Sequence, residues 1–181
     1  MKVFAFLADG FEETEAVATI DVLRRAEINV ITVSISNNKT VTGAHGIPVI
    51  ADEIFAETDF STADLLFLPG GMPGTKHLGE HEGLKQLLLY QVNSGKKIAA
   101  ICAAPTVLAK IGILDNKEAI CYPGFESDLT NAVISTKTVV KSGNVITGKG
   151  PGVTIPFALK VVEELKGKAV ADKIAADLCF E

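Results

Sequence analysis

The stretch KKIAAICAAPTVLAKIG, residues 96–112, decides the fold. Residues Lys97–Ile101 predict a short apolar strand, and residues 103–111 predict a helix with Pro105 near its start, where a missing amide donor is harmless. Cys102 therefore lies on a tight strand-to-helix turn, the geometry of a nucleophile elbow. Free amides and the dipole at the start of the helix favour the thiolate there. A buried, inert cysteine is the alternative interpretation.

The composition fits one cytoplasmic α/β domain. Of the 181 residues, 48% are hydrophobic and 6% aromatic, which is typical of a parallel sheet between helices. The length suits a single domain, residues 1–181. The formal charge of −5 argues against a nucleic-acid or anionic-membrane partner, either of which needs clustered Lys and Arg. Asp9 interrupts the N-terminal apolar run, so neither a signal peptide nor a membrane span is expected.

Apolar strands alternate with amphipathic helices along the chain. Strands are predicted at residues 2–7, 29–36, 64–68 and 97–101, and a hairpin at 137–147. Residues 41–50 predict either a short hairpin or an irregular crossover, which Pro48 confines to an edge. Helices are predicted at residues 11–28, 81–93, 103–111, 153–165 and 168–178. The inner stripe of the first helix comprises Phe11, Ala16, Val17, Ile20, Leu23 and Ala26. This order predicts a doubly wound α/β sandwich of three layers, with a mostly parallel sheet and helices on both faces.

The ends of three predicted strands carry unusual residues, namely Asp9-Gly10, Pro69-Gly70-Gly71 and Cys102. Ligand sites in open parallel sheets lie beyond the carboxyl ends of the strands, so these segments should converge. The backbone amides of Gly71 and Ala103 can then form an oxyanion hole beside the sulfur. Alternatively, the glycines only end a strand. The whole segment PGGMPG, residues 69–74, predicts a turn that no regular element enters.

Partners for a reactive thiol are few. The three histidines, His45, His77 and His81, all precede Cys102. His77 and His81 are four residues apart and can share a helix face, where solvated surface positions are the simpler interpretation. Cys102, Cys121 and Cys179 have no metal-type spacing and are an odd number, so neither a metal site nor a disulfide framework is expected.

Acidic residues open the first helix, directly after the first strand. Glu12 and Glu13 are explained by helix-start chemistry, which complements the dipole. Glu15 shares a face with Phe11 and Thr19, so its carboxyl can point inward. A carboxyl in an apolar pocket beside a thiolate has a raised pKa and donates a hydrogen bond to the sulfur. Glu15 is therefore the predicted acid partner of Cys102.

Four motifs in order resemble the ThiJ/PfpI superfamily, and most closely its protein deglycase branch. They are ADGFEETEAV with IDVLRR, the LPGG turn, AAICAAPTVLA and a late GPG before a helix. The resemblance implies a flavodoxin-like sandwich, a homodimer and an oxidation-prone cysteine at the elbow. Carried over by position, the nucleophile is Cys102, the protonated carboxyl is Glu15, and the amide donors are Gly71 and Ala103, with Gly70 supporting them.

Two positions depart from the pattern of that branch. Where many members have a histidine before a proline, this chain has Tyr122, which can bind a substrate oxygen but is no base near neutral pH, since its ordinary pKa is about 10. His45 stands where relatives often have an arginine that reaches the partner subunit. Either Tyr122 or His45 can replace the missing histidine. Ala103 argues against protease activity, because the protease-like branch has histidine directly after the cysteine.

The resemblance implies a cofactor-free glyoxalase or deglycase that acts on 2-oxoaldehydes or their adducts. The residues suit that chemistry: a Cys102 thiolate adds to an aldehyde, Glu15 moves a proton between adjacent carbons, and the amides hold the oxyanion. PGGMPG and GKGPG lack the phosphate-binding spacings, so no nucleotide cofactor is predicted. The alternative is an oxidative-stress-responsive redox sensor or chaperone that uses oxidation of Cys102 without turnover.

A low thiol pKa does not by itself make a catalyst. Lowering it from about 8.5 to about 5.5 raises the thiolate fraction at neutral pH roughly thirty-fold. A Brønsted slope of about 0.45 lowers the intrinsic nucleophilicity roughly twenty-fold over the same range. The net gain is small, so catalysis must come from the acid and the oxyanion hole.

Overall fold

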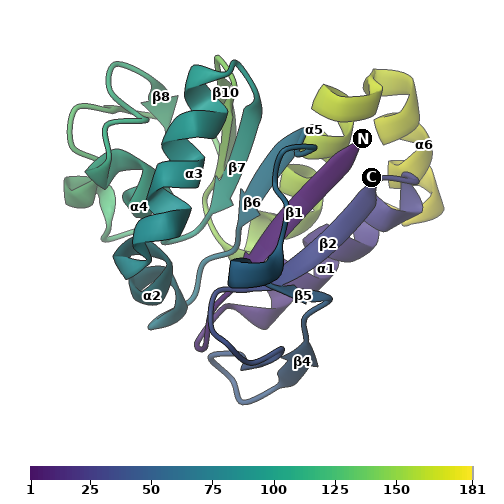
Figure 1. Ribbon diagram of the computed structural model, residues 1–181. Coiled ribbons are helices and arrows are strands. Elements are labelled where there is room, and N and C mark those ends of the chain that lie inside the picture. Colours follow the sequence, from purple (N-terminus) through teal and green to yellow (C-terminus); the bar gives the residue numbers. More distant parts are fainter. Residues whose placement is uncertain (181) are drawn as a thin grey trace.

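A seven-stranded sheet forms the middle layer of the protein (Figure 1). The computed structural model describes residues 1–180, so Glu181, the last residue of the predicted domain, lies outside the described residues. The strand order is β10-β11-β7-β6-β1-β2-β5, and only the β10–β11 pair is antiparallel. The strands are β1 Lys2–Leu7, β2 Asn29–Ser34, β5 Glu53–Ile54, β6 Leu65–Leu68, β7 Lys97–Ile101, β10 Val139–Ser142 and β11 Val145–Gly148. The mostly parallel sheet predicted from the sequence is confirmed.

Helices cover both faces of this sheet, as Figure 1 shows. One face carries α1 Glu13–Arg25, α5 Thr154–Lys166 and α6 Lys168–Asp177, and the other carries α2 Gly74–Glu80, α3 Glu82–Asn93 and α4 Pro105–Lys110. Short 3-10 turns are η1 Phe55–Glu57, η2 Glu126–Asp128 and η3 Pro151–Val153. The predicted three-layer arrangement is confirmed. Among the described residues, no helix is both long and apolar enough to cross a membrane.

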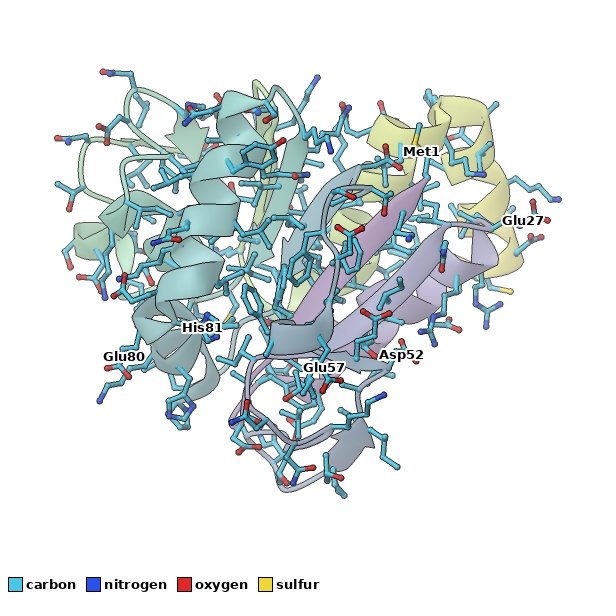
Figure 2. All side chains as sticks on the ribbon, in the orientation of Figure 1. Met1, Glu27, Asp52, Glu57, Glu80 and His81 are labelled. Atoms are coloured by element: carbon cyan, nitrogen blue, oxygen red, sulfur yellow. The ribbon has the colours of Figure 1, made fainter. Side chains whose placement is uncertain are left out.

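The central strands are apolar along their whole length because they face two cores. In β1, Val3 and Ala5 join the core beneath α1 and α5, whereas Phe4 and Phe6 join the core beneath α3. Successive side chains of a strand point to opposite faces, so a strand buried on both sides has no polar positions. Figure 2 shows side chains filling the space between the layers, while the exposed carboxylate of Glu80 lies at the outer edge.

Two hairpins predicted from the sequence are present. β3 Thr40–Thr42 pairs with β4 Pro48–Ile50 as a separate antiparallel ribbon, and β10 pairs with β11 at the edge of the main sheet. β8 Glu118–Ala119 and β9 Val133–Ile134 form a separate short parallel pair, and β8 packs beside β10 of the main sheet. The β3–β4 ribbon contacts the start of α1, because the Ala44 amide donates to the Phe11 carbonyl at 2.8 Å.

The turn after β6 departs from the prediction, because α2 begins at Gly74, within PGGMPG. Gly74 and Gly79 lower the helix propensity of this segment, so sequence patterning does not reveal the helix. A Cβ at Gly74 would lie 2.6 Å from the Phe11 amide nitrogen, which explains the glycine. His77 and His81 do not share a helix face: His77 is in α2, whereas His81 caps α3, its ring accepting from the Leu84 amide at 3.0 Å.

Val17 is not part of the inner stripe of α1. Its side chain is 51% exposed, whereas Ala16, Ile20 and Leu23 are buried. Val17 lies instead in a shallow groove between α1 and the β3–β4 hairpin. The apolar residues of α1 therefore lie on two sides of the helix. One side packs against the sheet, and the other is exposed in this groove.

Candidate active site

Cys102 lies at a sharp turn between β7 and α4. Its φ of 65° falls in the left-handed region that residues with side chains rarely adopt. The Cys102 amide donates to the Gly148 carbonyl at 2.9 Å, and the Cys102 carbonyl accepts from the Tyr122 amide at 2.8 Å. These two bonds hold the strained residue from both sides. The elbow predicted from the sequence is present, at the carboxyl end of a central strand.

Glu15 lies on the buried side of α1, against the sulfur. It is fully buried, and its Oε2 accepts from the Gly70 amide at 2.9 Å. The carboxyl and the Cys102 thiol are close enough to shift one another's pKa, although Oε1 has no partner with full hydrogen-bond geometry among the described residues. Burial raises the pKa of Glu15 to about 7, against the hydrogen bonds from Cys102 and Gly70. Glu15 is thus poised to gain or lose a proton near neutral pH.

The three predicted strand ends converge. The Glu12 amide donates to the Gly70 carbonyl at 2.9 Å, and the Gly74 amide donates to the Gly10 carbonyl at 3.1 Å, which joins the end of β1 to the LPGG turn. A Cβ at Gly70 would lie 2.5 Å from the Cys102 Cβ and 2.8 Å from Glu15 Oε2. The glycine is therefore what allows the carboxyl and the sulfur to meet.

The backbone amides of Gly71 and Ala103, the predicted oxyanion donors, lie near the Cys102 sulfur and act to lower its pKa. Burial, and after it the charge and side chain of Glu15, outweigh them and raise the pKa of Cys102 to about 12. While Glu15 is ionised, its charge disfavours the thiolate, so the thiolate predicted from the sequence requires the protonated form of Glu15.

The sulfur can ionise when Glu15 takes up a proton. Protonation removes the negative charge beside the sulfur and turns the carboxyl into a hydrogen-bond donor. The two groups then titrate as a pair rather than as separate residues. The thiolate-and-acid pair predicted from the sequence is one protonation state of this pair, and a thiol beside a carboxylate is the other.

A cavity of about 310 Å³ opens onto the sulfur. It brings together five of the residues that the sequence singles out: His45, Gly71, Cys102, Ala103 and Tyr122. Glu15 and Gly70 do not line it and lie behind the sulfur instead. The rest of the lining comprises Glu12, Ala44, Met72, Phe125 and Pro151. The cavity suits a small substrate that reaches the sulfur from the open side.

Glu13 has a role that the sequence does not indicate. It is buried, with 6% exposure, and its Oε1 accepts from the amides of His45 (2.7 Å) and Ile47 (3.3 Å). Its Oε2 lies 2.8 Å from the His45 ring Nδ1. The expectation that Glu13 only complements the helix dipole is wrong, because the β3–β4 turn folds over it. Although burial acts to raise the pKa of Glu13, the hydrogen bonds from His45 and Ile47 lower it.

One group of side chains in residues 1–180 has a spacing that could suit a metal ion. Glu12, Glu13 and His45 each offer a ligand atom, and these atoms lie within 4.8 Å of one another. Both Glu13 oxygens already accept hydrogen bonds from the turn, and Glu12 Oε2 accepts from the Glu15 amide at 2.6 Å. Their carboxylates are thus used to build the loop and the helix start, so the group is explained without a metal.

The fold and this site define a three-layer α/β protein with a cysteine elbow and a buried carboxyl against the sulfur. The model of the DJ-1/PfpI family matches residues 1–164, and the chain belongs to this family. The family resemblance seen in the sequence is therefore confirmed.

Relatives cover nearly the whole chain. Drosophila melanogaster Protein dj-1beta is 41% identical over 98% of this chain and 96% of its own length. The Caenorhabditis elegans glutathione-independent glyoxalase DJR-1.2 is 36% identical over 93% of this chain and 90% of its own. The structure of oxidized Toxoplasma gondii DJ-1 superposes with a TM-score of 0.95 at 37% identity, covering 99% of this chain and 98% of that one.

Replacing Glu15 with glutamine should flatten the pH dependence of stability. Folding raises the pKa of Glu15 from 4.5 to about 7. Below pH 4.5 the carboxyl is protonated in both the folded and the unfolded chain, so its favourable contribution to the free energy of unfolding is complete. As the pH rises toward 7, the carboxyl ionises first in the unfolded chain, and that contribution is lost. The wild-type protein should lose roughly 3 kcal/mol of unfolding free energy across this window. Urea unfolding at several pH values measures the slope, with exposed Glu80→Gln as the control. Equal slopes for wild type and Glu15→Gln would contradict the assignment.

Proposed function

We propose that residues 1–181 form a single ThiJ/PfpI-type domain that acts as a cysteine-dependent, cofactor-free glyoxalase or deglycase on 2-oxoaldehydes or their adducts. The observation that carries the proposal is the placement of the Cys102 sulfur between the buried Glu15 carboxyl and an open cavity of about 310 Å³. The glyoxalase name of the nematode relative supports the same substrate class. These substrates are small enough for the cavity.

The first step is addition of the sulfur to the aldehyde. As the new C–S bond forms, the thiol proton passes to the Glu15 carboxylate, and the aldehyde oxygen becomes an alkoxide. The amides of Gly71 and Ala103 already face the sulfur, so they can stabilise this oxyanion at low reorganisation cost. A carboxyl with a pKa of about 7 suits both directions of proton transfer near neutral pH.

In the second step Glu15 first returns the thiol proton to the alkoxide oxygen. As a carboxylate again, it removes the proton from the carbon bonded to sulfur, and the electron pair forms an enediolate with the neighbouring carbonyl. That proton is then delivered to the neighbouring carbon, and the hydroxyl proton on the first carbon moves to the enediolate oxygen. We assign the proton transfer between the carbons to Glu15, because its carboxyl contacts the sulfur to which the first carbon is bonded. The product is a 2-hydroxyacyl thioester on Cys102. Tyr122, which also lines the cavity, is placed to hydrogen-bond a substrate oxygen.

A redox sensor or chaperone is the second candidate function. A free thiol that opens onto a cavity and has two backbone amides nearby is suited to hold the oxygens of a sulfenic or sulfinic acid. The Toxoplasma relative was solved in an oxidized form. Against this role, the raised pKa of Cys102 lowers its thiolate fraction. In either role a cytoplasmic location fits, since all three cysteines are free.

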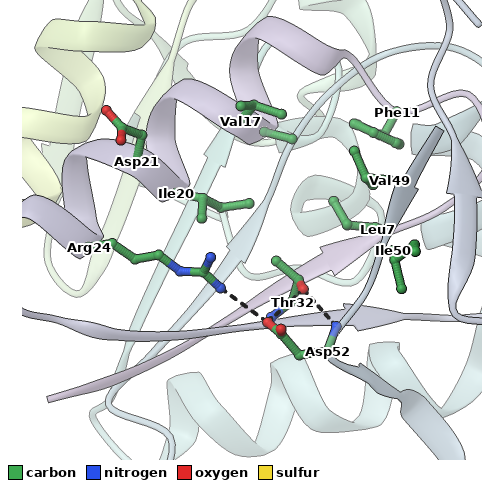
Figure 3. A pocket seen from close by; sticks show the side chains of 11 residues that line it. Leu7, Phe11, Val17, Ile20, Asp21, Arg24, Thr32, Val49, Ile50 and Asp52 are labelled. Carbon is green, nitrogen blue, oxygen red and sulfur yellow. Dashed lines mark hydrogen bonds and ion pairs between the residues drawn. The ribbon is translucent and has the colours of Figure 1, made fainter. Parts of the chain in front are cut away.

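A homodimer is proposed through the groove beside α1 (Figure 3). The groove encloses about 290 Å³, and Val17 and Ile50 on its walls are 51% and 78% exposed. At its edge Arg24 Nη2 lies 3.1 Å from Asp52 Oδ2. A face with an apolar centre and charges of both signs is complementary to a second copy of itself across a two-fold axis.

Methylglyoxal should be converted to lactate by the wild-type protein and not by Cys102→Ser. Loss of the nucleophile should lower kcat/KM roughly 1,000-fold or more. Enzymatic detection of lactate measures the rate, and Cys179→Ser, at an exposed cysteine, is the matched control. If the wild-type protein formed lactate no faster than Cys102→Ser, the enzyme proposal would be excluded and the sensor proposal would remain.

Under the sensor proposal, peroxide should oxidise Cys102 before Cys121 and Cys179. Cys102 borders the cavity and faces two amide donors, whereas Cys121 is fully buried and does not line this cavity. Peptide mass spectrometry after graded peroxide exposure gives the order. Oxidation of Cys179 ahead of Cys102 would exclude the sensor.

Val17→Asp and Ile50→Asp should each favour the monomer. Burying an unpaired carboxylate in both subunits should raise the dimer dissociation constant by about 100-fold or more. Light scattering during size-exclusion chromatography measures the mass. The matched control is Val133→Asp, since Val133 is 59% exposed on β9, away from the groove. A dimer that survives both substitutions would exclude this surface.

A further inference from the structure

The proposed reaction leaves a thioester on Cys102, and that thioester must be hydrolysed. Hydrolysis needs a base that holds a water molecule on the open side of the sulfur. Glu15 is fully buried behind the sulfur and does not line the cavity. Tyr122 lines the cavity, but a phenol with an ordinary pKa of about 10 is a poor base near neutral pH. The base must therefore be another residue of the cavity wall.

His45 is the remaining cavity residue whose ordinary pKa is near neutral. Its Nδ1 lies 2.8 Å from Oε2 of Glu13. A carboxylate can only accept, so Nδ1 carries the proton and Nε2 is left as the acceptor. The histidine side chain is 71% exposed, whereas that of Glu13 is 8% exposed. A buried carboxylate thus fixes the tautomer of a ring that remains accessible from the cavity.

Glu13 also fixes the backbone that carries His45. Its Oε1 accepts from the His45 and Ile47 amides at 2.7 and 3.3 Å. One carboxylate therefore orients the ring and the turn on which the ring stands. Hydrolases that use general-base chemistry have a similar arrangement: a buried carboxylate orients a histidine, and the nucleophile is a separate residue.

We propose that His45 is the base that activates water for hydrolysis of the Cys102 thioester, with Glu13 as its positioning residue. This inference rests on the proposed function. His45 Nε2 removes a proton from water as the water oxygen bonds to the thioester carbon. The tetrahedral intermediate then collapses, the C–S bond breaks, and its electron pair leaves with the sulfur. The imidazolium proton returns to the sulfur through solvent, which releases the hydroxy acid and restores the thiol.

The charges around His45 set the pH range of this step. Glu13 and Glu12 face it from the start of α1, and Cys102 and Tyr122 lie across the cavity. The hydrogen bond and charge of Glu13, followed by the charge of Glu12, raise the pKa of His45 above 6.5. Below this pKa Nε2 is protonated and cannot act as a base, so hydrolysis should accelerate with pH through it. Glu13→Gln should lower the pKa and move the limb to lower pH.

The hydrolytic step can be measured without methylglyoxal. Cys102 is acetylated with p-nitrophenyl acetate, excess reagent is removed, and loss of the acetyl group is followed by intact-protein mass spectrometry. His45→Ala should deacetylate about 100-fold more slowly than wild type, and added imidazole should restore much of the rate. His77→Ala is the matched control, because its Nδ1 bonds the Asp9 carbonyl at 2.9 Å and it does not line the Cys102 cavity.

A proton NMR titration of the His45 ring provides a readout independent of activity. Its pKa should be above 6.5 in wild type and lower in Glu13→Gln. Equal deacetylation by wild type and His45→Ala would overturn the inference, as would a His45 pKa unchanged by Glu13→Gln. Wild-type protein that is not acetylated, or that keeps its acetyl group, would also overturn it. If deacetylation depends on His45 but no lactate forms from methylglyoxal, the glyoxalase proposal would be excluded and the role of His45 would stand.

Discussion

The contact between the Glu15 carboxyl and the Cys102 sulfur is the constraint on which the site depends. It requires a carboxyl that is fully buried and a cysteine held at a φ of 65°. Both are costly, since a buried acid must give up hydration and a left-handed cysteine is strained. The costs are met by the surrounding fold: parallel strands bring the two segments to one sheet edge, and Gly70 lacks the Cβ that would separate them.

This contact changes what makes the sulfur reactive. A nucleophile with a permanently low pKa gains little, because lower basicity lowers intrinsic nucleophilicity nearly as much as it raises the thiolate fraction. In this site burial and the adjacent Glu15 raise the pKa of the thiol, while burial raises that of the carboxyl to about 7. A sulfur that surrenders its proton to Glu15 only as it attacks retains the nucleophilicity of a basic thiolate. In the proposed reaction, the amides of Gly71 and Ala103 then stabilise the charge on the substrate oxygen.

Sequence patterning identifies the sheet, the elbow and the inward direction of Glu15, because each follows from local periodicity or from residues next to one another. Buried parallel strands are continuously apolar, and the spacing from Phe11 to Thr19 places Glu15 on the inner face of α1. The rest depends on distant segments. Glu13 is buried by a turn some thirty residues later in the chain, and α2 forms despite its glycines because tertiary contacts override propensity.

The pKa values of two carboxyls in a single turn of α1 are therefore shifted in opposite directions. Glu15 meets a thiol and one amide, and burial raises its pKa, whereas Glu13 meets two amides and an imidazole, which hold its pKa low. The difference arises from the segment that packs against each carboxyl. Glu15 lies against the strand end behind the sulfur, and Glu13 lies against the β3–β4 turn. A carboxyl with a raised pKa and one with a lowered pKa, two residues apart, can thus serve opposite sides of the same sulfur. The acid can handle the proton of the thiol, and the carboxylate can orient a base toward water in the cavity.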